Sequence, residues 1–252
     1  MTGVQTCALP ILVGTVVALA DKLETLAGMF GIGNLPSGDK DPFALRRHAL
    51  GVIRMLSEQS LPLNVSDLLA LAFGTLAGKL LQDAQAAREA LLAFVFDRLA
   101  GSLREQGFSA QEVDAVLSLR PERLGEVRRR LEAVRAFAQL PEAAALAAAN
   151  KRIGNILKKA QEVDPHVSDV LLKEPAEKNL FAAMQATTPK AQQQWAQGDY
   201  TASLQTLAAL RVPVDAFFEN VMVNAEQLDL RLNRQGLLKQ LHVAMNRVAD
   251  LS

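Results

Sequence analysis

The sequence predicts an all-α fold, and three observations lead to that prediction. Half of the residues are apolar but only 5% are aromatic, whereas strands are enriched in aromatic and β-branched residues. Apolar residues recur with the 3.6-residue period of a helix in one segment after another. No segment alternates apolar and polar residues convincingly enough to predict a strand. We therefore expect a series of helices joined by loops rich in Gly, Pro and Ser.

The first half of the chain is expected to form six helices. Residues 15–33 place apolar side chains on one face and stop at a Gly-Ile-Gly sequence. In residues 41–56, Asp41 can cap the free amides of the first turn, and Pro42 sits where its missing N–H is harmless. The other helices are expected over residues 66–81, residues 87–107, and on both sides of Pro121 within residues 108–143.

The beginning of the chain predicts a buried helix and no membrane span. Residues 8–20 are apolar but fall short of the roughly 20 residues that a spanning helix needs, and no basic leader precedes them. Residues 1–12 are an atypical lead-in, and we expect the chain to be a fragment of a longer protein. The single Cys7 excludes an internal disulfide and a cysteine-based zinc site, which fits a reducing cytoplasm as the expected location.

The second half begins with a long Ala-rich helix, and we place a domain boundary where it starts. This boundary separates residues 13–141 from residues 142–252. Loops near Pro165, Pro189, Gly198 and Pro213 are expected to separate the helical segments that follow. Those segments are residues 174–185, 190–210, 212–223 and 225–251.

The usual signatures of an active site are missing. The sequence has no Gly-x-x-x-x-Gly-Lys phosphate loop, no Gly-x-Ser-x-Gly elbow and no His-Glu-x-x-His zinc pair. His48, His166 and His242 lie far apart without a carboxylate pattern that could orient a catalytic base. Basic and acidic residues number 27 each, so no global positive field attracts nucleic acid. Any binding to RNA would need a local patch, and we expect no binding to DNA or to membranes.

Two basic clusters in the second half are candidate RNA contacts. Their charged groups can donate to phosphates, and the Asn155 amide could read a base edge. A solvated helix face would carry the same residues, so the pattern by itself leaves both interpretations open. A third cluster, Arg128–Arg130 with Arg135, is interpreted as a solvated face paired with Glu126 and Glu132. The two candidate clusters are Lys151, Arg152, Asn155, Lys158 and Lys159, and Arg231, Asn233 and Arg234.

Three long stretches resemble the β subunit of bacterial tetrameric glycyl-tRNA synthetase. They are "LADKLETLAGMFGIGNLPSGDKDPFALRRHALGVIRML" at residues 19–56, "PEAAALAAANKRIGNILKK" at residues 141–159, and "VPVDAFFENVMVNAEQLDLRLNRQGLLKQLHVAMNRVADLS" at residues 212–252. The resemblance runs in the same order from about residue 14 to the end. It implies that residues 13–141 are the later helices of an HD-type domain and a helical linker. Residues 142–252 would be the helical-bundle anticodon-binding domain that arginyl-tRNA synthetase shares.

The resemblance also implies a function. The family is an α2β2 enzyme that joins glycine to its tRNA, with ATP and Mg used at the active site of the α subunit. The β subunit holds tRNA-Gly, so this chain is expected to carry no catalytic residue and no cofactor. Family patterns "A…R…I" and "D.LR..R...L" match Ala149, Arg152 and Ile156, and Asp229, Arg231, Arg234 and Leu238. The expected tRNA contacts are Lys151, Arg152, Lys158, Lys159, Arg231 and Arg234 at phosphates and Asn155 at a base.

Two other functions stay open at this point. One is an HD-type metal-dependent phosphohydrolase fragment, but such enzymes use a His, a His-Asp pair and a later Asp as ligands. Only Asp21 stands where that later Asp would be, and one carboxylate cannot hold a catalytic metal. We therefore predict no metal site. The other is a purely structural helical module that contacts a partner subunit.

Overall fold

The computed structural model describes residues 8–160 and 162–251, and its regular elements over those ranges are all helical. The only β pairing there is an isolated bridge between Ser37 and Lys40 in a loop. The predicted all-α fold is confirmed. The atypical residues 1–7, including Cys7, and Gln161 lie outside the described ranges. The chain divides into two compact units, residues 1–128 and 129–252, and each is described by itself.

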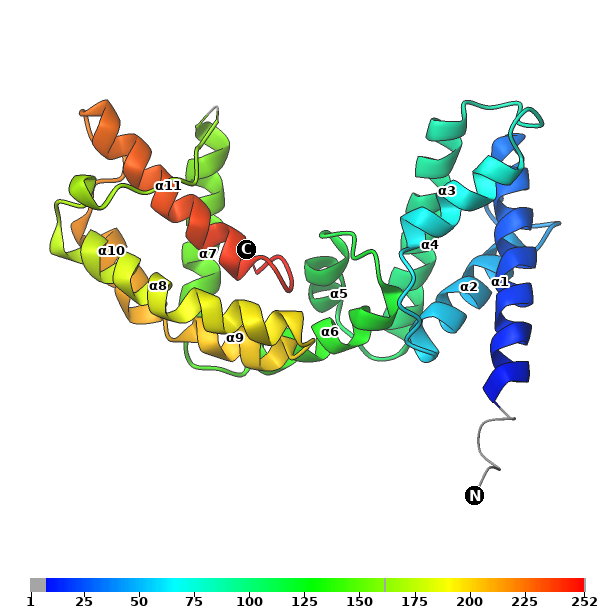
Figure 1. Ribbon diagram of the computed structural model, residues 1–252, viewed down its shortest axis with the longest axis horizontal. Coiled ribbons are helices and arrows are strands. Elements are labelled where there is room, and N and C mark those ends of the chain that lie inside the picture. The colour runs from blue at the N-terminus through cyan, green and yellow to red at the C-terminus, as the bar shows by residue number, and fades with distance from the viewer. Residues whose placement is uncertain (1–7, 161, 252) are drawn as a thin grey trace, which may run out of the picture. The chain divides into compact units, whose positions relative to one another are not determined.

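The first unit is built around α4, which packs against α1, α2, α3 and α5 (Figure 1). Fully buried leucines from these helices, among them Leu26, Leu56 and Leu91, form its core. The helices are α1 (Ala8–Gly31), α2 (Leu45–Glu58), α3 (Val65–Thr75), α4 (Ala84–Glu105), α5 (Ala110–Leu117) and the start of α6 (Leu124–Ala138).

The stretch "KDPFALRR" is a helix start. The Asp41 carboxylate accepts hydrogen bonds from the backbone amides of Leu45 and Arg46, at 2.8 and 3.0 Å. The expected cap is therefore confirmed, although α2 begins only at Leu45 because Ala44 adopts a left-handed backbone conformation with φ 54°. The Arg46 guanidinium donates to the Gly38 carbonyl, so it braces the preceding loop.

The second unit is a helical bundle in which α8 lies beside α9 and α10, and α11 packs on α7 and α8 (Figure 1). Ile153, Leu180, Phe217 and Leu238 are among the fully buried side chains of its core. The helices are α7 (Ala143–Lys159), the short 3-10 helix η1 (Asp169–Leu171), α8 (Pro175–Ala196), α9 (Tyr200–Ala208), α10 (Arg211–Asn220) and α11 (Leu228–Met245).

Of the two prolines expected to lie between helices, Pro213 follows a break, because α9 ends at Ala208 and α10 begins at Arg211, whereas α8 has no break at Pro189. Helix α8 continues through Pro189. Pro189 and Gln185 are both exposed, so the carbonyl that Pro189 leaves without a donor can be hydrated, while Met184 and Ala191 anchor both halves of α8 in the core. Pro213 lies in the first turn of α10, where its missing N–H has no intrahelical partner to lose.

Helix α6 departs from its interpretation as a solvated face at Arg130, whereas Arg128, Arg129 and Arg135 are exposed as expected. The Arg130 side chain is 8% exposed, and its guanidinium lies 5.2 Å from the ring centroid of Tyr200. Ala133 and Phe137 belong to the core of the second unit. The division between compact units therefore falls inside α6, before the boundary expected at residue 142, and the functional division at residue 142 stays a prediction.

Candidate nucleic-acid interface

A groove of about 900 Å³ runs between α7 and the beginning of α11. Its α7 wall carries most of the charged side chains, and its α11 wall carries exposed leucines. The loops after α7 and before α11 also contribute lining residues. The lining residues are Ala148, Lys151, Arg152, Asn155, Ile156, Lys159, Ala160, Glu162, Asn224, Leu228, Arg231, Leu232 and Gln235.

The groove is strongly cationic although the whole chain has no net charge. Lys151, Arg152, Lys159 and Arg231 line it together with a single carboxylate, Glu162. The three α7 cations are exposed, and Arg231 is half-buried. Four positive groups around one negative group create a local positive potential, which the equal totals of acidic and basic residues conceal.

The helical phase of α7 decides which of its polar residues face the groove. Lys151, Asn155 and Lys159 recur every four residues and therefore lie on one side of the helix. Lys158 is not among the lining residues. The sequence grouped Lys158 with Lys151 and Asn155, whereas the structure puts Lys159 in that place.

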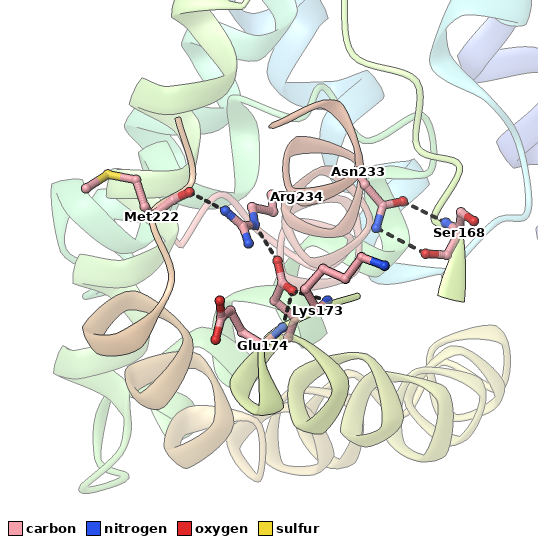
Figure 2. Close-up of polar contacts among 7 residues, drawn as sticks. Ser168, Lys173, Glu174, Met222, Asn233 and Arg234 are labelled. Atoms are coloured by element: carbon pink, nitrogen blue, oxygen red, sulfur yellow. Dashed lines mark hydrogen bonds and ion pairs between the residues drawn. The ribbon is translucent and has the colours of Figure 1, made fainter. Parts of the chain in front are cut away.

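Arg234 lies in a buried junction outside the groove (Figure 2). Its side chain is 5% exposed, and its Nε donates to the carboxylate of Glu177, which is fully buried. Arg234 Nη1 donates to the carbonyl of Met222 at 2.8 Å. The Glu177 carboxylate also accepts from the backbone amides of Lys173 and Glu174, at 2.7 and 2.8 Å. Arg234 therefore joins α11 to the start of α8 and to the loop after α10.

The segment that follows α7 lies along α11 and is tied to it by backbone contacts. The Asn233 amide accepts from the Ser168 N–H at 2.7 Å and donates to the Ser168 carbonyl at 3.2 Å (Figure 2). Gln240 donates to the Pro165 carbonyl at 2.6 Å. Between them, a Cβ at Gly236 would lie 2.6 Å from the carbonyl oxygen of His166, so glycine permits this close approach. We call residues 162–168 the strap.

A polar network joins α7 to the other end of α11. Asn150, which is fully buried, donates to the side-chain oxygen of Asn246 at 2.8 Å, and its own oxygen lies 2.9 Å from Nδ1 of His242. Burial lowers the pKa of His242; Asp250 opposes this effect, while Lys239 and Lys158 reinforce it. His242 is therefore a structural residue between two helices.

Comparison with known proteins identifies the families of both halves. Residues 7–118 match the glycyl-tRNA synthetase beta subunit family, and residues 146–251 match the DALR anticodon binding domain. The chain belongs to the glycyl-tRNA synthetase beta subunit family. The groove and the buried junction both lie within the part that matches the anticodon binding domain.

Curated relatives in this family are highly similar to the chain. It is 71% identical over 240 residues to the glycine–tRNA ligase beta subunit of Acidovorax sp. (strain JS42), a match that covers 95% of this chain and 33% of that protein. The same subunit of Polaromonas naphthalenivorans is 71% identical over 241 residues, again 95% of this chain and 33% of that protein. That of Leptothrix cholodnii is 64% identical over 240 residues, with the same coverage. The chain thus spans about a third of the length of the relatives it matches.

Within this synthetase-family chain, the groove brings together five of the seven residues expected to contact tRNA. The other two do not line it: Lys158 is exposed on α7, and Arg234 is committed to internal partners. We no longer expect Arg234 to contact phosphate, because its buried guanidinium already binds Glu177 and Met222. The five groove residues are Lys151, Arg152, Asn155, Lys159 and Arg231.

Sequence reasoning missed other residues of the interface. Glu162 and Gln235 line the groove, but nothing in their local sequence distinguishes them from surface residues. Phe218 was missed too, and no local signal distinguishes it from a core residue, because adjacent helix residues can both be buried, as Leu237 and Leu238 are. Phe217 is fully buried, and the Phe218 ring instead lies under the Arg152 guanidinium, 4.3 Å from its centroid to Cζ.

Among the described residues, no group of three or more His, Cys, Asp or Glu side chains could hold a metal ion, and Asp21 is exposed on α1. Over the same residues, none of the helices combines the length and the apolar character that crossing a membrane requires.

Proposed function

We propose that this chain is the tRNA-binding part of a glycine–tRNA ligase β subunit and that the α7–α11 groove binds the anticodon arm of tRNA-Gly. The observation that most supports this proposal is the cationic groove itself. It lies inside a match to an anticodon binding domain and collects four positive side chains around the Asn155 amide. Phosphates supply the charge that such a groove attracts, and an amide can read the edge of an unpaired base.

The walls of the groove suit a single strand better than a duplex. Leu228 and Leu232 are 55% and 46% exposed where they line it, so they leave apolar surface open inside the groove. Unpaired bases present apolar faces as well as polar edges, and sequence-specific RNA recognition mostly targets such unstacked bases. Lys151, Lys159 and Arg231 would hold the backbone while a base packs on the leucines.

In this proposal the chain contributes position and no bond-making step. Gripping the anticodon arm fixes the orientation of the whole tRNA, so that its acceptor end reaches the α subunit, where glycine, ATP and Mg react. Correct orientation of reactants is worth several kcal/mol of barrier. The partners are therefore tRNA-Gly and the α subunit in an α2β2 assembly, and we expect this to take place in the cytoplasm.

Two neighbouring lysines provide a matched test. Lys159→Glu reverses a charge inside the groove, and Lys158→Glu makes the same change one residue away on another side of α7. Lys159→Glu should weaken tRNA-Gly binding about tenfold, the value of a charged hydrogen bond, and reduce the slope of log affinity against log salt by about 0.7. Lys158→Glu should have a much smaller effect on both. Equal effects would contradict the assignment of the groove.

A second experiment tests what the groove reads. The affinity of the chain for tRNA-Gly is compared with that for tRNA-Gly carrying altered anticodon bases. Weaker binding to the altered tRNA would support base reading, and equal affinity would reject it while leaving backbone binding in place. Binding of the α subunit with no affinity for either tRNA would reject the proposal in favour of a structural subunit contact.

A further inference from the structure

Phe218 and Arg152 form a cation–π pair beside the groove. The Arg152 guanidinium carbon lies 4.3 Å from the centroid of the Phe218 ring, within the range of a cation–π contact. Arg152 extends from α7 and lines the groove, whereas Phe218 belongs to α10 and is half-buried. We propose that Phe218 is a positioning residue, which holds the Arg152 guanidinium flat so that its N–H edge forms a two-point contact with an RNA phosphate. This inference rests on the proposed function.

The Phe218 ring is held in place by its contact with Phe217 and by the packing of α10. Its neighbour Phe217 is fully buried and meets it edge to face, with ring centroids 5.6 Å apart and planes at 82°. Helix α10 packs against both α7 and α8. At its end, the Val221 amide donates to the Phe217 carbonyl at 2.9 Å. The ring is therefore a fixed surface to which the long Arg152 side chain is fitted.

The donor groups of Arg152 are open to a ligand. A guanidinium is planar, so stacking on a ring occupies one face and leaves its five N–H groups pointing outward in that plane. Within residues 8–160 and 162–251, no carboxylate pairs with Arg152 and no acceptor takes its hydrogen bonds. The contrast with Arg234 is direct, since that guanidinium is used by Glu177 and by Met222.

The chemistry of arginine explains why the ring matters. Two parallel N–H groups can bind one phosphate in a fork, and this geometry gives direction as well as charge. A flexible arginine loses rotamer freedom when it binds, and a side chain already held in its bound shape loses less. Lys151 and Lys159, which line the same groove, act as point charges and gain nothing from a flat support.

The test is a double-mutant cycle on the full 252-residue chain with tRNA-Gly as the ligand. Phe218→Leu keeps an apolar side chain but removes the aromatic face, and Arg152→Lys keeps the charge but removes the fork. Each should weaken binding about two- to fivefold, the range of an exposed cation–π contact. The double variant should bind no more weakly than Arg152→Lys alone, and Phe218→Tyr, which keeps the face, should bind like the unchanged chain.

Controls separate positioning from general damage. In a Lys159→Ala background, the effect of Phe218→Leu should be retained in full, because Lys159 does not touch the ring. The salt slope of Phe218→Leu should equal that of the unchanged chain, since this variant removes no charge. Urea unfolding accompanies every variant, and Phe218→Met repeats the comparison if leucine lowers the folded fraction.

Three outcomes would overturn the inference. They are an unchanged affinity in Phe218→Leu, an effect of Phe218→Leu that multiplies fully with that of Arg152→Lys, and binding by Phe218→Tyr as weak as that by Phe218→Leu. Each of these leaves the proposed function standing, because the unchanged chain still binds tRNA-Gly in all of them. Failure of the unchanged chain to bind tRNA-Gly would instead reject the proposed function together with this inference.

Discussion

The second unit holds arginines in two contrasting places, the buried junction around Arg234 and the open groove around Arg152. In the junction, an arginine and a glutamate satisfy each other and three backbone groups out of contact with water. In the groove, an arginine has one face on an aromatic ring and its donors exposed. Both residues are cationic, and they come from the two helices that form the groove, Arg152 from α7 and Arg234 from α11.

This contrast shows that charge alone does not identify a ligand contact. A buried ion pair is costly to break, because removing one partner leaves the other charge stranded without water. An exposed cation can be removed with little effect on folding but takes its ligand contact with it. Stability and RNA binding should therefore respond to different residues in the same small region.

The largest expected effect comes from breaking the junction. Arg234→Met should lower the free energy of unfolding by about 3–5 kcal/mol, because Glu177 would remain buried without its partner. Urea denaturation measures this, with Arg231→Met as the control on the same helix, for which we expect a change within about 0.5 kcal/mol. Adding Glu177→Gln to Arg234→Met should recover part of the loss, since no buried charge is then left. Equal effects of Arg231→Met and Arg234→Met would erase the distinction between the two places.

Substitutions in the groove should have the opposite effect, because they should weaken RNA binding and leave stability nearly unchanged. Replacing the four groove cations with alanine should lower tRNA-Gly affinity about a hundredfold or more and reduce the salt slope by roughly 3, at about 0.7–0.9 for each phosphate that is no longer neutralised. The substituted residues are Lys151, Arg152, Lys159 and Arg231. Thermal unfolding should change little. Alanine at the exposed Lys178 and Lys190 on α8 is the control, and an equal fall in affinity there would mean that the groove has no special role.

A smaller effect on stability should distinguish Asn233 from Asn155. Asn233→Ala removes both hydrogen bonds to the Ser168 backbone and should cost about 1–2 kcal/mol of stability, with faster amide hydrogen exchange at Ser168. Asn155→Ala, on the exposed wall of the groove, should leave stability unchanged and affect only RNA binding. A stability loss at Asn155 as large as at Asn233 would count against the distinction.

The smallest effect is a pH dependence at His242. Burial holds the pKa of this imidazole below its ordinary value of 6.5, so the unfolded chain binds more protons than the folded chain between the two pKa values. Stability should therefore fall as the pH drops below 6.5. The fall should be smaller in His242→Gln, which cannot titrate. Melting temperatures of the two proteins between about pH 7.5 and about pH 5 measure it, and parallel curves would show that His242 is not responsible.

Local signals in the sequence were sufficient for the helices and for one wall of the groove. Capping predicted that Asp41 binds the first amides of α2, although the helix begins at Leu45, and periodicity predicted the Ala-rich α7, because both depend on neighbours within a few residues. Pro189 was misleading, since its cost depends on whether the carbonyl of the preceding turn faces solvent. A sequence does not display that information.

Which basic residues line the groove and which are buried in internal contacts could not be predicted in the same way. Arg231 and Arg234 are three residues apart in one motif, and only the position of Glu177, 57 residues earlier, makes the second one internal. Lys158 and Lys159 are adjacent on α7, and which of them lines the groove depends on how α11 packs against α7. Residues far apart in the chain decide both cases, whereas pattern reasoning uses near neighbours.

The close approach at Gly236 also fixes how far α11 can move along its own axis. The strap passes so near that a Cβ there would meet two carbonyl oxygens, at 2.6 and 2.9 Å. Sliding the helix by one turn would bring Leu232 or Gln240 to this position, where a side chain would meet the carbonyl oxygens of the strap. The strap therefore restricts axial movement of α11 and, with it, the alignment of the two walls of the groove.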